Sequence, residues 1–123
     1  MAITRTAKDE QRASECAKQL LAINDALDML KGKWKIRIIG SLTFGKKRFK
    51  EMQRDVQGIT VKMLSKELKE LEVNALVVRT VHNTIPVTVE YELTEYGKTL
   101  DSVIEELRNW GTKHRKRIIK RSK

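Results

Sequence analysis

The chain contains little cysteine, proline or aromatic side chain, and these shortages exclude several classes of protein. One cysteine, Cys16, cannot form an intrachain disulfide framework. Two histidines far apart in the sequence form no zinc site and no nucleophile–base pair. No run of about 18 apolar residues marks a transmembrane helix, and the first residues lack the apolar core of a signal peptide. We therefore expect a cytoplasmic protein with no catalytic site, no metal and no cofactor.

Acidic side chains are outnumbered by basic ones. The 123 residues include 26 Lys and Arg against 16 Asp and Glu, a formal net charge of +10. This excess indicates a polyanionic partner, which is DNA, RNA or an anionic membrane surface. Residues 113–123 carry seven of the basic side chains and no acid, which leaves 19 basic against 16 acidic residues, or +3, elsewhere. The segment either adds non-specific affinity for phosphate or is a solvated end.

The most informative segment is residues 60–73, which has the pattern of an amphipathic helix. Leu64, Leu68 and Leu71 share one face and predict a buried seam. Thr60 precedes the helix as an N-cap residue. The polar face carries Lys62, Ser65, Lys66 and Lys69, with glutamates on its flanks. Such a helix fits a DNA major groove, although a simple solvated helix has the same pattern.

The periodicity of apolar residues predicts a mainly α (α+β) chain of one domain. Helices are expected over residues 9–30, 34–42, 49–56 and 60–73, strands over residues 76–82 and 87–93, and a last helix over residues 94–117. Gly97 and Gly111 lie within the last helix, where close helix–helix approach would justify a cost of about 1 kcal/mol each. This order of elements is that of a winged helix-turn-helix with a two-stranded β-hairpin wing.

The first and last helices carry apolar stripes longer than a small winged core can cover. Unburied apolar area of this extent predicts a partner helix, and hence a homodimer. The expected dimerisation residues are Cys16, Leu20, Ile23, Leu27, Leu100, Val103, Ile104, Leu107 and Trp110.

Several motifs in order resemble those of the HxlR-type transcriptional regulators, a group of the MarR-like winged-helix proteins. The matching segments are Gly32-Lys33-Trp34, Arg48-Phe49, Gly58-Ile59, residues 64–72, residues 86–94, Gly97 and Trp110. The resemblance implies a sequence-specific homodimeric regulator on a near-palindromic operator of double-stranded DNA. The resemblance covers roughly residues 26–111. Together with the apolar stripes and the charge pattern, it divides the chain into dimerisation helices at residues 1–31 and 94–117, a winged core at 33–93 and a basic tail at 118–123. The recognition helix is then residues 60–73, and the wing, residues 82–87, lies at the minor groove.

The DNA-binding candidates fall into three groups by position. Thr60, Lys62, Ser65 and Lys66 face base edges in the major groove. Lys69, Lys46, Lys47 and Arg48 face phosphates, although Arg48 is equally suited to tying the helix pair to the sheet. The wing candidates are Arg79, His82 and Thr84, of which His82 is expected to be an exposed turn residue rather than a pH switch.

The positive charge allows two other partners besides double-stranded DNA, which are RNA and a membrane surface. A basic architectural or RNA-binding protein without sequence specificity would explain the charge, but aromatic residues make up only 5% of the chain and RNA-binding folds usually stack bases on aromatics. A membrane-surface helix is disfavoured because residues 113–123 contain only two apolar residues.

The cysteine does not match the redox position of the family. Some relatives sense oxidants through a cysteine shortly before Gly-Lys-Trp, but the resemblance places that position at Leu21. Cys16 shares the apolar stripe, which favours packing, and a redox role stays open. A small-molecule effector near Trp34 or Trp110 rests on fold analogy alone.

Overall fold

The computed structural model describes residues 4 and 6–121, which belong to two compact units, residues 1–32 and 33–123. Among the described residues of the first unit, the regular element is the helix α1 (Ala7–Met29), in which no residue is buried. Thr6 begins it: its Oγ1 accepts from the Asp9 amide at 3.2 Å, and the Asp9 carboxylate accepts from the Thr6 amide at 3.2 Å. The helix expected over residues 9–30 is confirmed, and it runs without a break.

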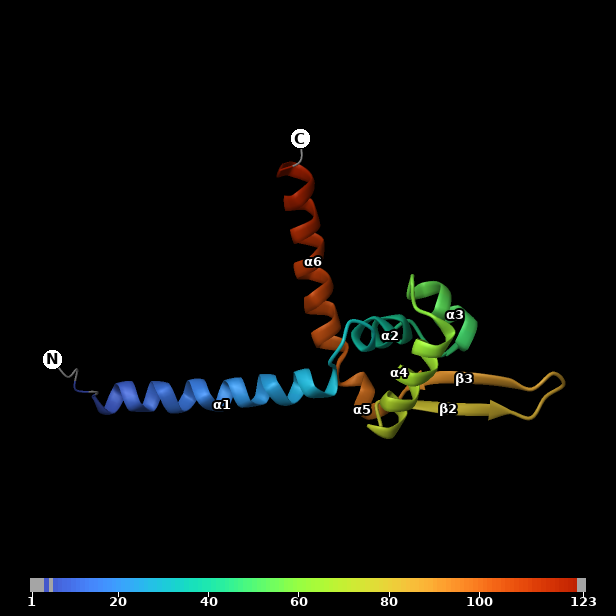
Figure 1. The fold of residues 1–123 in the computed structure, drawn as a ribbon, viewed down its shortest axis with the longest axis horizontal. Coiled ribbons are helices and arrows are strands. Elements are labelled where there is room, and N and C mark those ends of the chain that lie inside the picture. The colour runs from blue at the N-terminus through green and yellow to red at the C-terminus, as the bar shows by residue number, and fades with distance from the viewer. Residues whose placement is uncertain (1–3, 5, 122–123) are drawn as a thin grey trace. The chain divides into compact units, whose positions relative to one another are not determined.

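The second unit holds the other elements (Figure 1). In chain order they are α2 (Lys35–Leu42), β1 (Lys47–Arg48), α3 (Phe49–Asp55), α4 (Val61–Val73), β2 (Val77–His82), β3 (Thr88–Leu93), α5 (Glu95–Lys98) and α6 (Asp101–Arg121). The arrangement of α3, α4 and the β2–β3 hairpin confirms the mainly α winged helix-turn-helix. No helix in the described part of the chain is both long enough and apolar enough to cross a membrane.

The core of this unit lies where α2 packs against α3, α4 and β3. It confirms the leucine seam of α4, because Leu64, Leu68 and Leu71 are all fully or almost fully buried. Each such side chain contributes about 1.5–3 kcal/mol of hydrophobic free energy relative to its exposed state. Ile38, Ile39, Met52 and Val77 are also fully buried. Trp34, just before α2, is half-buried, with the Lys33 ammonium 4.6 Å from its ring centroid.

The expected two-stranded hairpin is present as β2 and β3, and a third strand that was not expected, β1, completes the sheet. Its order is β1-β3-β2, and both pairings are antiparallel. Lys47 pairs with Tyr91 and Arg48 with Glu90. At two residues, β1 is too short to show the alternation that marks a strand in a sequence. Lys47 and Arg48, which the sequence indicated as phosphate contacts, therefore also join the wing to the helix pair.

The single last helix expected over residues 94–117 is also wrong, because α5 and α6 are separated at Thr99 and Leu100. Three hydrogen bonds of Thr94 fix the start of α5: its amide donates to the Leu76 carbonyl at 3.1 Å, its hydroxyl donates to the Ala75 carbonyl at 2.6 Å, and its Oγ1 accepts from the Gly97 amide at 2.9 Å. Thr94 is thus anchored to the two residues before β2, and the chain turns again at Thr99 and Leu100 before α6 begins.

The C-terminal basic segment is helical rather than a tail. The helix α6 continues to Arg121, with Lys120 and Arg121 in its last turn, where the helix dipole favours cations. The expected tail of residues 118–123 is therefore wrong as far as Arg121, and Ser122 and Lys123 lie outside the described residues.

Candidate nucleic-acid interface

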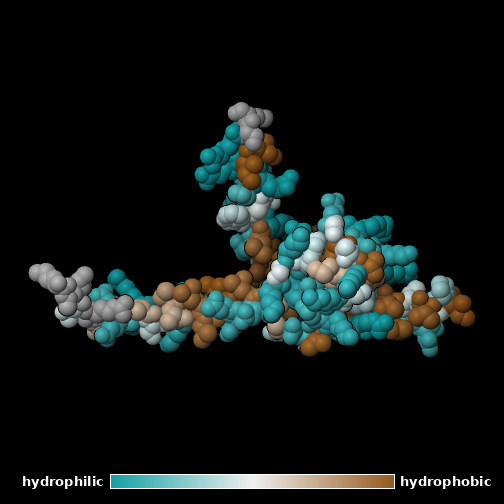
Figure 2. Space-filling model, viewed as in Figure 1, coloured by the Kyte–Doolittle hydropathy of each residue, from teal (hydrophilic) through white to brown (hydrophobic). Residues whose placement is uncertain are grey.

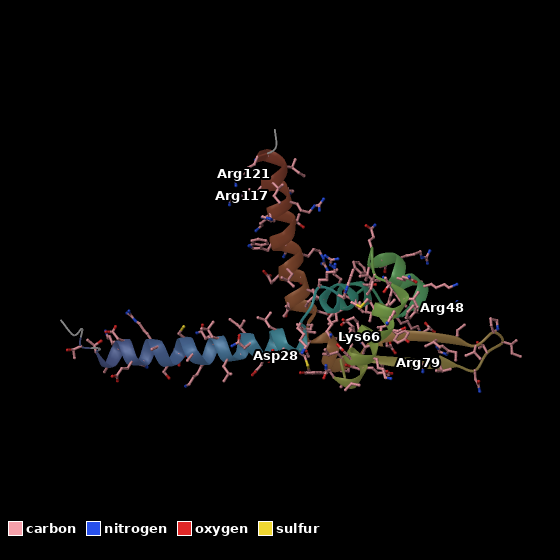
Figure 3. All side chains as sticks on the ribbon, in the orientation of Figure 1. Asp28, Arg48, Lys66, Arg79, Arg117 and Arg121 are labelled. Carbon is pink, nitrogen blue, oxygen red and sulfur yellow. The ribbon has the colours of Figure 1, made fainter. Side chains whose placement is uncertain are left out.

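The polar face of α4 is open to solvent. Thr60 accepts a hydrogen bond from the Met63 amide at 3.1 Å, which satisfies a donor of the first helical turn. The seam of leucines holds the opposite face in the core. Exposed on the outer face are Lys62, Ser65, Lys66 and Lys69, of which Lys66 is labelled in Figure 3. This face therefore brings together the four α4 side chains predicted to contact DNA.

A buried ion cluster, which sequence reasoning missed, joins α4 to α2. The Lys35 ammonium lies 2.5 Å from the Glu67 carboxylate and also bonds that of Glu70. Lys35 is 4% and Glu67 is 7% exposed, so the expectation that Glu67 lies on an exposed flank is wrong. Burial alone would lower the pKa of Lys35, but the hydrogen bonds and charges of the two carboxylates outweigh it and raise that pKa above its ordinary value.

The sequence contains a signal for this cluster. Lys35 stands three and four residues before Ile38 and Ile39, so helical spacing puts it on the buried face of α2. A lysine there requires a charged partner, since an unpaired buried ammonium is very costly.

A second ion cluster involves Lys47. Its ammonium bonds the Asp55 carboxylate and lies 3.1 Å from Ser41 Oγ, and the Ser41 hydroxyl donates to Asp55 at 2.8 Å. The hydrogen bond from Lys47, followed by that from Ser41, holds the pKa of Asp55 below its ordinary value. Lys47 thus shares its charge with a carboxylate of the protein itself, whereas Lys46 and Arg48 are exposed.

Arg48 has the structural role that the sequence left open, through its main chain. It is the last residue of β1 and the residue before α3, and its amide donates to the Glu51 carboxylate at 2.9 Å. Its side chain is exposed beside these elements (Figure 3). The main chain of Arg48 therefore connects sheet and helix, while its guanidinium stays accessible to a phosphate.

The wing candidates differ in how much of each side chain is accessible. Arg79 is exposed on β2 (Figure 3). His82 is not a turn residue as expected, because it ends β2, is half-buried and places Nε2 2.5 Å from the Glu90 carboxylate. The Thr84 hydroxyl donates to the Pro86 carbonyl at 2.8 Å within the turn. Ile85, in the turn of the hairpin, has a fully exposed side chain. The end of the hairpin shows brown, hydrophobic surface (Figure 2).

The two terminal helices expose most of the apolar residues expected at a dimer interface, and Figure 2 shows brown surface on both. On α6, Trp110 stacks on His114 with ring centroids 4.9 Å apart, beside exposed Val103 and Leu107. Ile104 is only 6% exposed, so it packs within its own chain and its assignment to the dimer interface is wrong. On α1 the four expected dimerisation residues, Cys16, Leu20, Ile23 and Leu27, are all exposed.

The sequence profile of the HxlR-like helix-turn-helix family matches residues 29–119 of this chain. This chain belongs to the HxlR-like helix-turn-helix family. Its HxlR-like core contains the ion cluster of Lys35 and the whole of α4 and the wing.

With individual proteins, the similarity covers more of the chain than residues 29–119. The uncharacterized HTH-type transcriptional regulator YtcD of Bacillus subtilis strain 168 is 41% identical over 104 residues, which are 85% of this chain and 82% of YtcD. The solved redox regulator HypR in its reduced form superposes with a TM-score of 0.74 at 37% identity, over 80% of this chain and 98% of HypR. A protein assigned to the MarR family, from Enterococcus faecalis V583, superposes with a TM-score of 0.69 at 32% identity over 97% of both chains.

These similarities establish the class of function. The HxlR-like chain is a DNA-binding transcriptional regulator, and its relatives are named as regulators rather than as enzymes. The helix pair α3–α4 is accordingly its helix-turn-helix, with α4 as the second helix.

Proposed function

We propose that this HxlR-like protein binds a near-palindromic operator as a homodimer, with one α4 in the major groove of each half-site. The observation that carries the proposal is the division of α4 into a buried leucine seam and an exposed face of Lys62, Ser65 and Lys66. The β2–β3 wing, with Arg79, His82 and Thr84, then lies at the adjacent minor groove.

The exposed side chains of α4 determine what kind of reading is available. Lysine donates to guanine O6 and N7, and serine adapts to several base edges. That face carries no arginine among residues 60–73, so bidentate reading of guanine is not available from it. Thr60 adds a hydroxyl at the helix start, while Lys69, one turn beyond Ser65, is placed for phosphate.

In the proposed complex, residues just before α3 add contacts to DNA phosphates to the contacts that α4 makes. Lys46 and Arg48 are exposed there, and both precede the first helix of the pair. Lys47 stays in the proposal only as a weaker contact, because its ammonium already bonds Asp55 and Ser41.

The apolar stripes of α1 and α6 support the homodimer. Leu20, Leu27, Leu107 and Trp110 each leave more than half of their surface exposed, which a partner helix would cover. A two-fold dimer would present two copies of α4 about 34 Å apart, one duplex turn, which matches the half-site spacing of dimeric helix-turn-helix proteins.

A competition experiment tests the proposal. Fragments of the source genome that the protein retains supply the operator, and a scrambled duplex of the same composition competes at about 150 mM salt. The operator should compete at least about 10³-fold better than the scrambled duplex. Equal competition would instead favour a basic architectural protein, and stronger binding of single-stranded RNA would favour an RNA-binding protein.

Two substitutions on α4 sharpen the test. Lys66→Ala should cost about 1–3 kcal/mol on the operator and little on scrambled DNA, since it removes a base contact. Lys69→Ala should weaken both duplexes alike, since it removes a phosphate contact. An equal loss on both duplexes for Lys66→Ala would remove Lys66 from the base-reading set.

Cys16 is proposed as a packing residue of the dimer rather than a sensor. It is exposed on the apolar stripe of α1, where a free thiol behaves as a small hydrophobe. The similar protein HypR is a redox regulator, so the question is open to experiment. If diamide releases wild-type protein from its operator but leaves Cys16→Ser bound, Cys16 is a sensor and the packing assignment is wrong.

A further inference from the structure

The ion cluster of Lys35, Glu67 and Glu70 connects α2 to the helix proposed to read DNA. Lys35 is the first residue of α2, and both carboxylates come from successive turns of α4. One buried ammonium thus bonds two points of the same helix, at 2.5 Å in the case of Glu67. Glu67 follows Lys66 directly, so the bonded side chain and the exposed lysine are neighbours on α4.

Stability alone does not explain a buried ion pair at this position. Taking two charges out of water costs about as much as their attraction returns, and well-packed apolar residues of similar volume often stabilise equally or better. The ion pair adds a dependence on the orientation of α4 relative to α2. Charge-assisted hydrogen bonds depend on the positions of both partners, whereas apolar contacts such as the leucine seam are non-directional.

Rotation of α4 about its axis is the movement that these bonds restrict. With side chains included, a helix has a radius of about 5–6 Å, so a rotation of about 20° moves a side-chain tip by about 2 Å. A displacement of that size breaks a hydrogen bond to a base edge. The leucine seam would permit small rotations that the bonds of Lys35 do not.

We propose that Lys35 is a positioning residue that fixes the rotation of α4 through Glu67 and Glu70, and thereby determines which base edges Lys62 and Lys66 reach. The inference rests on the proposed function, because it concerns the specificity of that same helix. Lys35 itself is buried and contacts no DNA in this account.

The test compares sequence preference with general DNA affinity. The probe is a library of random-sequence duplexes, from which bound molecules are recovered and sequenced. The first variant combines Lys35→Met with Glu67→Met, which fills the buried volume, removes the directional bonds and leaves the net charge unchanged. Glu70 keeps 42% of its side chain exposed and remains solvated.

The expected result is a loss of preference without a loss of binding. The double variant should bind the unselected library within about twofold of wild type, because the net charge, which sets non-specific affinity, is unchanged. Its ratio of affinities for the wild-type-enriched and a scrambled duplex should fall at least tenfold. Exchanging the partners, with Lys35→Glu and Glu67→Lys, should recover most of that ratio because the bond is restored with reversed polarity.

A matched control separates positioning from stability. Val77→Ala shortens a fully buried side chain of β2, outside the α2–α4 cluster, and should lower the melting temperature without changing the enriched sequence. Should the methionine pair fail to fold by circular dichroism, Lys35→Gln with Glu67→Gln takes its place. This pair is also charge-neutral, and it should lower the ratio severalfold.

The outcomes distinguish the two proposals. If wild type enriches no sequence, the proposed function fails and the inference fails with it. If wild type enriches a sequence and the folded double variant enriches it equally, the function stands and Lys35 has a structural role only.

Discussion

Gly97 lies against the main-chain carbonyl of Leu76, so closely that a β-carbon on residue 97 would overlap the oxygen atom. The sequence suggested a helix–helix contact at this glycine, but its neighbour is the residue just before β2. Because the obstacle is backbone, it cannot move aside as a flexible side chain would. The contact holds α5 at the base of the wing.

Alanine substitutions at Gly97 and Gly111 should therefore change the free energy of unfolding in opposite directions. Gly97→Ala should lower the free energy of unfolding by about 1–3 kcal/mol, as expected for forcing volume into a packed site. Gly111→Ala should raise it by up to about 1 kcal/mol, because Gly111 is helical with nothing within 4 Å of an added β-carbon. Urea unfolding of both variants measures the difference, and equal destabilisation would contradict the contact.

The second ion cluster, in which Lys47 and Ser41 bond Asp55, predicts that the stability of the fold depends on pH. The folded pKa of Asp55 is depressed, so its contribution is present above the unfolded pKa of about 3.9 and is lost as the pH falls through the folded value. Asp55→Asn should be destabilising near pH 7, by about 1 kcal/mol or less since solvent screens a half-exposed pair. The deficit relative to wild type should disappear in acid. In a Lys47→Gln background this pH dependence should be reduced but not abolished, since the Ser41 hydrogen bond to Asp55 remains. An unchanged pH dependence there would exclude Lys47 as the main cause.

Lys46 and Lys47 should differ in their effect on DNA binding, although they are adjacent. Lys46→Ala should weaken all duplexes alike and reduce the slope of log affinity against log salt by about 1, as expected for one lost phosphate contact. Lys47→Ala should reduce the slope less, because its ammonium already bonds Asp55. Titrations between 50 and 300 mM salt measure both slopes, and a larger change for Lys47 would reverse the assignment.

Leu107 tests the dimer. Its side chain is 51% exposed on α6, so Leu107→Glu should leave the helix folded and produce a monomer at micromolar concentration. Operator affinity should fall at least tenfold, since one half-site alone is then bound. Sedimentation velocity measures the state of assembly. Glu105→Ala, roughly opposite Leu107 on the same helix, serves as the control. A dimer that survives Leu107→Glu would place the interface elsewhere.

The parts of the fold that the sequence predicted are those with long periodic patterns. Leu64, Leu68 and Leu71 repeat at helical spacing, and the alternation through β3 continues for six residues. Strand β1 was missed because two residues have no period, and the break before α6 was missed because the apolar stripe continues across it. Contacts between distant residues determine both features.

The candidate site was predictable to a similar degree. Exposed lysines on α4 follow from the position of the leucine seam, so Lys62 and Lys66 were placed correctly on its outer face. The internal bonds of Lys47 and His82 depend on side chains from other elements, and composition gives no sign of them. Lys35 is the exception, since a charge on an apolar helix face was visible in the sequence.

The two-residue strand β1 has a consequence for the kind of operator that this protein can tolerate. Strand β1 hydrogen-bonds to β3 and continues at Arg48 directly into α3. The hairpin and the helix pair are therefore connected rigidly and not by a flexible linker. In the proposed complex, the distance between the major-groove contact of α4 and the minor-groove contact of the wing is then set by the folded chain. Inserting a single base pair between those two contacts should abolish recognition, while changing bases under the hairpin alone should only weaken it.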